Sequence, residues 1–281
     1  MSKAVLVPTD FSDNAAAAAR YAAQMARHFG WSIHLLHLYT PFSTAFGGEE
    51  LNREAQELAA NEAESNMTAA AADLEEEFSG VVITTDCKQG VMSDVVYRTA
   101  REAKNNLIVM GTKGASGLKH AVLGSNTFEI IKNSPIPVLA VPETPPTFQQ
   151  RNVGLLTNFQ PSEIEALEAF IAIGEAPQQV TLIHLFEKGA NKDERDLADW
   201  AKHIQDRTAI SRVLDKTAPF SDRMDVKEDF PEHVFRLAQS DGMDLLIVSR
   251  ERKGFFDKLF SGDRVKAMAH QLEIPIFFHN A

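Results

Sequence analysis

A pattern of strands and helices that occurs twice is the feature that most constrains the fold of this chain. Apolar, β-branched runs alternate with helical segments from the N-terminus, which is typical of a parallel sheet flanked by helices. After residue 152 the same order begins again, and an internal duplication is the best account of the 281 residues. The segments that match in order are 5–11 with 153–159, 35–38 with 182–185, 96–98 with 234–236, 107–109 with 246–248 and 136–138 with 274–276.

The first half is predicted to contain five strands and the helices between them. Ser12 is expected to cap the first helix, and Gly30 stands where helices end. Three prolines between 142 and 150 interrupt both ladders and helices and indicate a linker. We therefore predict one domain over 1–144, a linker over 145–151 and a second domain over 152–281. The predicted strands are 4–7, 31–38, 81–88, 107–110 and 137–141, and the predicted helices are 12–29, 49–78, 93–104 and 124–132.

The charge balance limits the classes of partner. The net charge of -11 argues against nonspecific binding of nucleic acid, which needs a basic face. Residues 49–78 hold ten acids and one base, and we interpret them as a long helix with a solvated acidic face; an acidic docking surface for a basic protein is the alternative. No run approaches the ~18 apolar residues of a membrane span, so we expect a cytoplasmic protein without membrane contact. The apolar stripe expected to be buried is Leu51, Leu58, Met67, Leu74 and Phe78.

A glycine pattern follows the predicted strand 107–110. Gly111 and Gly114 are expected to turn the backbone with positive φ, and Gly124-Ser125 to open a helix whose free N–H groups favour an anion. This arrangement indicates a phosphate cradle. Asp10 follows the first strand, and if the two strands are neighbours it faces the same crevice, where its carboxylate would accept hydrogen bonds from an adenine amino group or a ribose hydroxyl. A turn or helix-capping role for Asp10 is the alternative.

These motifs resemble those of the nucleotide-binding universal stress protein family, over nearly the whole chain. The residues that carry the resemblance are Gly111-x2-Gly114-x9-Gly124-Ser125, Pro8-Thr9-Asp10 and 35–38. The resemblance implies a tandem member with two α/β domains, each a five-stranded parallel sheet of order 3-2-1-4-5, whose fifth strands pair as an intramolecular pseudo-dimer; it leaves open whether the chain forms a homodimer. It implies ATP in the crevice, with Asp10 and Leu38 at the adenine, Pro8, Thr9 and Met110 along the nucleoside, and Gly111, Gly114, Gly124, Ser125 and Asn126 around the phosphates.

The second half departs from this pattern. In the sequence alignment Gly111 matches Arg250, Ser125 matches Asp263 and Asp10 matches Asn158, while the later glycine is kept as Gly262. An arginine side chain would obstruct close approach of a ligand, and a carboxylate repels phosphate. We therefore predict that ATP binds only to the N-terminal half. The basic residues of the second half could hold another anion, and those of the first glycine loop could contact phosphate; a solvated charged surface is the alternative for both groups. They are Arg250, Arg252, Lys253 and Arg264 in the second half, and Lys113, Lys119 and His120 in the first.

The sequence offers no catalytic constellation. His37 and His184 occupy matching strand positions and are interpreted as structural, no metal-ligand spacing is present, and Mg²⁺ would arrive with the nucleotide. We expect an ATP-binding stress-response or regulatory protein that is at most a weak ATPase, with an unidentified protein partner. An interaction scaffold without nucleotide is the first alternative. An adenylate-forming enzyme of a related fold is the second.

Overall fold

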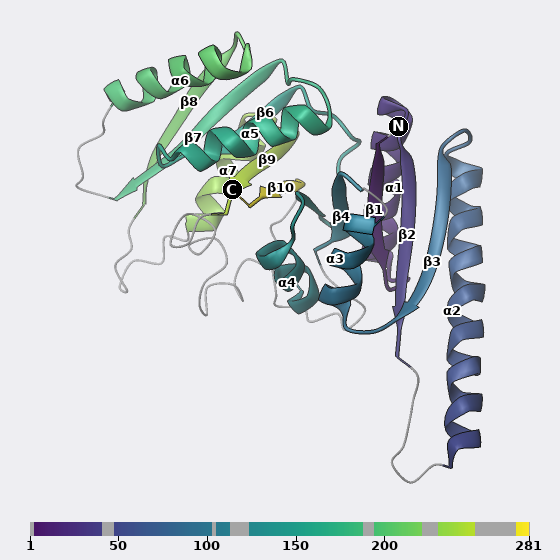
Figure 1. The fold of residues 1–281 in the computed structure, drawn as a ribbon. Coiled ribbons are helices and arrows are strands. Elements are labelled where there is room, and N and C mark those ends of the chain that lie inside the picture. Colours follow the sequence, from purple (N-terminus) through teal and green to yellow (C-terminus); the bar gives the residue numbers. More distant parts are fainter. Residues whose placement is uncertain are drawn as a thin grey trace.

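The computed structural model describes residues 3–40, 48–102, 105–112, 124–187, 194–220, 230–250 and 274–280. Strands and helices alternate through both halves, as the sequence pattern predicts (Figure 1). The first half comprises β1 (Ala4–Thr9), α1 (Asp13–Phe29), β2 (Ser32–Tyr39), α2 (Glu49–Glu77), β3 (Val82–Gln89), α3 (Met92–Glu102), β4 (Leu107–Gly111), α4 (Ser125–Asn133) and β5 (Val138–Val141). The second comprises β6 (Asn152–Leu156), α5 (Pro161–Ile173), β7 (Gln179–Glu187), α6 (Glu194–Thr208), β8 (Val213–Phe220), α7 (Phe230–Ser240), β9 (Leu245–Ser249) and β10 (Ile276–His279).

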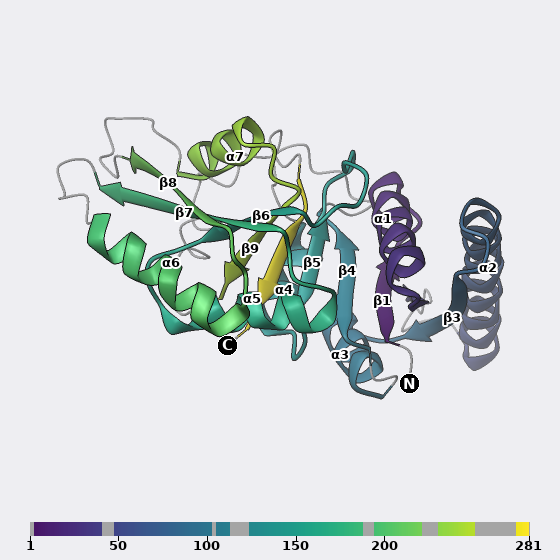
Figure 2. The same cartoon turned by 90° about the horizontal axis from the view of Figure 1, so that it is seen from above.

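The strands of both halves form one ten-stranded sheet of order β3-β2-β1-β4-β5-β10-β9-β6-β7-β8. Each half has the predicted order 3-2-1-4-5 with parallel neighbours. The two fifth strands, β5 and β10, pair antiparallel, with Ala140 opposite Ile276 (Figure 2). The edge that the fifth strand of an isolated half would leave open is thus covered by the other half.

Alternation along the strands divides the core of the first half into two layers. Val5 and Val7 are fully buried and face α1 and α2, whereas Leu6 points to the other face, toward α3 and α4. Both faces of the sheet are covered at β1 and β4, so these central strands read as continuous apolar runs. Polar residues that follow these strands are therefore confined to the sheet's ends, where a ligand site can form.

The expected apolar stripe on α2 is only partly right. Met67, Leu74 and Phe78 are buried, but Leu51 is 60% and Leu58 69% exposed. Figure 1 shows the reason: the N-terminal part of α2 extends beyond the ends of the strands that its C-terminal part covers. Helical spacing predicts which residues share a face, and it does not say where the sheet beneath that face ends.

The segment between the halves packs against the first half, and a separate contact joins the two halves directly. The backbone N–H of Phe148 donates to Gln24 Oε1 (2.8 Å), and its ring packs edge-on against Tyr21. Lys3 Nζ donates to the carbonyls of Ala172 and Ile173 at the end of α5 (2.6 and 2.8 Å). The limits 1–144, 145–151 and 152–281 remain predictions. Within the described residues, no helix combines the length and apolarity that crossing a bilayer requires.

Candidate functional site

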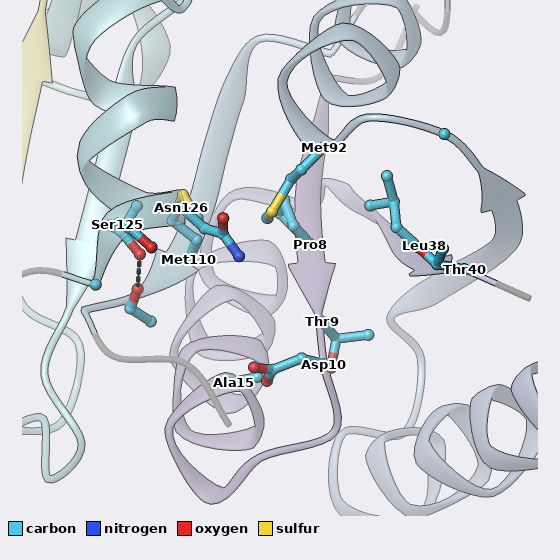
Figure 3. A pocket seen from close by; sticks show the side chains of 14 residues that line it. Pro8, Thr9, Asp10, Ala15, Leu38, Thr40, Met92, Met110, Ser125 and Asn126 are labelled. Carbon is cyan, nitrogen blue, oxygen red and sulfur yellow. Dashed lines mark hydrogen bonds between the residues drawn. The ribbon is translucent and has the colours of Figure 1, made fainter. Parts of the chain in front are cut away.

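A cavity of about 310 Å³ lies beyond the carboxyl ends of β1 and β4, which are neighbours in the sheet (Figure 3). Nine of the ten residues predicted to contact the nucleotide line it, and the tenth, Gly114, lies outside the described residues. The nine come from β1, β2, β4 and the start of α4: Pro8, Thr9, Asp10, Leu38, Met110, Gly111, Gly124, Ser125 and Asn126.

Five further lining residues were missed by the sequence reasoning: Ala15, Thr40, Gly90, Met92 and Thr127. Two of them directly follow strands, since Thr40 comes after β2 and Gly90 after β3. The rule that located Asp10, that ligands bind beyond the carboxyl ends of parallel strands, applies to these positions too and would have found them.

The turn from β1 to α1 is held by a chain of side-chain hydrogen bonds. Phe11 adopts φ 60°, and its N–H donates to Thr9 Oγ1 (3.1 Å). Asp10 Oδ1 accepts from the N–H and the hydroxyl of Ser12 (3.2 and 2.6 Å), and Ser12 caps α1 as predicted, accepting from Ala15 N (3.3 Å). Asp10 is therefore a turn residue that also borders the cavity, so the two interpretations of it are compatible.

The steric demand on Gly111 comes from α1. A Cβ at Gly111 would collide with the Asn14 side chain and would lie 2.9 Å from the Asn14 carbonyl oxygen. The expected positive φ is wrong for this glycine, which ends β4 in extended backbone. Glycine is needed here because a strand and a helix approach closely, and that approach sets one wall of the cavity.

The start of α4 is tied to the end of β4. Thr127 Oγ1 donates to the Gly111 carbonyl (2.8 Å), and Gly124 N donates to the Thr112 carbonyl (2.6 Å). Gly124 is the N-cap and offers no side chain, and the first turn carries no acid. The N–H groups of this turn and the positive end of the helix dipole thus border the cavity, which favours an anion there.

His37 and His184 make matching contacts in the two halves. The Nδ1 atom of His37 lies 2.8 Å from the Thr9 carbonyl oxygen, and that of His184 lies 3.0 Å from the Thr157 carbonyl oxygen. Because a carbonyl only accepts, each Nδ1 carries the proton. Each ring also packs against the phenylalanine of the preceding turn, Phe11 or Phe159, with centroids 4.3 and 4.7 Å apart. Both contacts fit the structural role predicted for these residues.

The strand register corrects the alignment of the two halves. Val5 pairs with Leu107, and the corresponding Val153 pairs with Leu245, not with Leu246. Gly111 therefore corresponds to Ser249, and the predicted match of Gly111 to Arg250 is wrong by one residue. Residues 246–248 repeat the sequence Leu-Ile-Val of 107–109, which favoured the shifted alignment, although a shift by one moves every side chain to the other face.

The second half places a carboxylate where the first half has a methyl group. Ala15 lines the cavity, and its counterpart, the third residue of α5, is Glu163. Glu163 is 3% exposed; its Oε2 accepts from Thr157 Oγ1 and its Oε1 from Asn158 N, both at 2.6 Å. The sequence reasoning missed Glu163. Asp263, Gly262 and the charged residues Arg252, Lys253, Arg264, Lys113, Lys119 and His120 lie outside the described residues.

Comparisons with known proteins agree with this geometry. The sequence profile of the Universal stress protein family matches residues 1–142. Universal stress protein MJ0531 of Methanocaldococcus jannaschii is 35% identical over 143 residues, 50% of this chain and 81% of the relative, and MJ0577 of that organism is 28% identical over 155 residues, 50% and 95%. A universal stress protein structure from Archaeoglobus fulgidus covers 100% of this chain and 97% of its own at TM-score 0.68 and 18% identity, which shows the same two-part fold.

Proposed function

Since the chain belongs to the universal stress protein family, we propose that its N-terminal half binds ATP in the cavity beyond β1 and β4 and acts as a nucleotide-responsive regulatory module. The main support is that the residues expected from the sequence to contact a nucleotide come from four separate segments and line one cavity. A volume of about 310 Å³ lies in the range of small-molecule sites.

The chemistry of the lining suits the two ends of a nucleotide. Leu38, Met92 and Met110 provide apolar surface for the base, which transfers favourably out of water. At the other side the first turn of α4 offers backbone N–H groups to phosphate oxygens. Asp10, at the end of β1, would face the base or the ribose, where a carboxylate can accept hydrogen bonds and does not oppose the phosphates.

Binding without rapid turnover is part of the proposal. Asp10 is the one ionisable side chain among the described lining residues, and it already accepts two hydrogen bonds from Ser12. Phosphoryl transfer needs groups that position the attacking water and stabilise the developing charge. Steady hydrolysis on the order of 1 s⁻¹, as in working phosphotransferases, would contradict this part.

Calorimetric titration of the full chain with ATP and Mg²⁺ tests the proposal. We expect saturable binding of one equivalent per chain, because among the described residues the second half carries the buried carboxylate of Glu163 where the first half has Ala15. Two equivalents would contradict the asymmetry. Absence of ATP binding would contradict nucleotide recognition and favour the scaffold alternative. Release of pyrophosphate with small carboxylic acids would favour the adenylate-forming enzyme.

A further inference from the structure

A second cavity, of about 340 Å³, lies between α1 and α2 on the face of the sheet that Val5 and Val7 occupy. Leu35 and Leu74 are buried along it, and Phe11 stands at the end nearest the β1–α1 turn. Four alanines, Ala16 and Ala19 of α1 with Ala69 and Ala70 of α2, leave the space open. None of these residues lines the cavity beyond β1 and β4.

The second half shows which positions correspond. An exposed ion pair joins Arg20 of α1 to Glu77 of α2 (2.9 Å), and a pair of reversed polarity joins Glu168 of α5 to Arg207 of α6 (2.7 Å). The buried residues of the helices agree with this match, since Met67 and Leu74 correspond to Leu197 and Ile204, and all four are buried. Counting from these pairs, Ala70 corresponds to Trp200, and Ala16 and Ala19 correspond to Ile164 and Leu167.

The second half therefore fills with its own side chains the space that the first half leaves open. Ile164 and Leu167 are buried at 2% and 0% exposure. The indole of Trp200 meets the ring of Phe159 edge-on, with centroids 6.2 Å apart, and Phe159 is the counterpart of Phe11. Close packing is the rule in protein interiors, so an open space at a position that the same fold closes with an indole indicates room for an aromatic ring.

The charges at the mouth define the other end of the ligand. Arg20 and Glu77 neutralise each other, and the remaining charged lining group is the exposed carboxylate of Asp73. In the second half the counterpart of Asp73 is His203, whose ring stacks on Trp200 at 5.7 Å. A side chain at position 73 thus lies beside the place that corresponds to the Trp200 indole, and a carboxylate there favours a cation.

We propose that the cavity between α1 and α2 is a second ligand site, which takes a small aromatic molecule carrying a protonated amine. The ring would lie where Trp200 lies in the second half, edge-on to Phe11, and the ammonium group would approach Asp73. The proposal of this second site does not rest on ATP binding, although Thr9 borders both cavities.

Titration with tryptamine, indole and indole-3-acetate, followed by NMR or calorimetry on the full chain, tests the proposal. A fragment of this size is expected to bind with a Kd of about 0.1 to 1 mM, tryptamine tighter than indole and indole-3-acetate weakest. Asp73→Asn should remove the preference for tryptamine over indole. Failure of the wild-type protein to bind tryptamine at about 10 mM, well above that Kd, would overturn the proposal.

Filling the cavity from within gives the decisive variant. Ala70→Trp introduces the side chain that the second half carries and should weaken tryptamine binding by at least about tenfold, while leaving the chain folded. The matched control is Ala72→Trp, an exposed position on the same helix outside the lining, which should bind as the wild type does. Equal binding by the Ala70→Trp and wild-type proteins would place the probe elsewhere, for instance in the nucleotide cavity, and would overturn the proposal. If Ala70→Trp does not fold, Ala19→Leu serves as the second filling variant.

Discussion

The turns that follow β1 and β6 share a backbone conformation and one side-chain hydrogen bond, yet the helices after them begin with side chains of opposite character. Thr9 and Thr157 accept from the N–H two residues later, and Phe11 and Phe159 adopt φ 60° and 62°. The difference lies in the third residue of the next helix. Ala15 leaves space there, whereas Glu163 places its own carboxylate there, held by two hydrogen bonds. The contact between the threonine and the phenylalanine is thus kept in both halves, and we propose that the side chain at position 15 or 163 decides whether an anion can enter.

The strongest test of this comparison moves the carboxylate into the first half. Ala15→Glu should weaken ATP binding by about 100-fold or more, because a carboxylate within several ångströms of phosphate costs a few kcal/mol even at an effective dielectric constant near 20. Calorimetry measures the loss. The control is Ala17→Glu, which adds the same charge to α1 outside the lining. Unchanged affinity in a folded Ala15→Glu protein would show that the methyl group at 15 does not select the ligand.

The reverse change should not create a second nucleotide site. Glu163→Ala leaves Thr157 Oγ1 and Asn158 N without their carboxylate, and losing hydrogen bonds to a charged group should destabilise the second half by about 2–3 kcal/mol. Urea unfolding in a Trp31→Phe background, where Trp200 is the remaining tryptophan, reports on that half. Glu163→Gln keeps the shape and should cost less. A gain of ATP binding by Glu163→Ala would mean that Glu163 alone closes the crevice.

The sequence predicted the architecture well because it appears twice. Apolar runs mark buried parallel strands in each half, and the agreement of two copies indicated the duplication. The family resemblance supplied the order 3-2-1-4-5 and the pairing of β5 with β10, which the sheet has. The ends of strands, where polar residues follow apolar ones, located Asp10 and the glycine pattern of Gly111 and Gly124-Ser125. The family resemblance supplied the other lining residues, which are Pro8, Thr9, Leu38, Met110 and Asn126. The duplication and the strand ends depend on periodicity and chain order, which a sequence states directly.

The features that the sequence could not predict depend on the register between neighbouring strands and on how deeply a side chain is buried. Two consecutive leucines allowed Gly111 to be matched with Arg250, and only hydrogen bonding between strands distinguishes that match from the correct one with Ser249. Glu163 was overlooked because an acid in the first turn of a helix is ordinarily exposed there, favoured by the dipole. Its burial follows from Thr157 and Asn158 folding back over the helix start.

The corrected register predicts a change of intermediate size in the free energy of unfolding. Gly111 lies against Asn14, whereas the counterparts of these two residues in the second half are Ser249 and the smaller Ser162. Gly111→Ser should destabilise the first half by about 1–3 kcal/mol through overpacking. Adding Asn14→Ser should recover at least about 0.5 kcal/mol, since contacting sites couple. Urea unfolding followed by Trp31 in a Trp200→Phe background measures both, and strictly additive effects would contradict the proposed exchange of sizes.

The smallest effect is expected at the ion pairs whose polarity differs between the halves. Arg20 and Glu77 are 52% and 49% exposed, and exposed pairs contribute about 0.2–1 kcal/mol. Arg20→Glu should therefore cost about 0.5 kcal/mol or slightly more, because it also sets two like charges together. The double variant Arg20→Glu with Glu77→Arg reproduces the polarity of Glu168 and Arg207 and should return to the wild-type stability in low-salt urea unfolding. If the double variant is no more stable than Arg20→Glu alone, neighbouring charges such as Asp73 determine which residue of the pair is basic. The opposite polarity of the two ion pairs would then be a consequence of the open cavity beside Arg20 and Glu77.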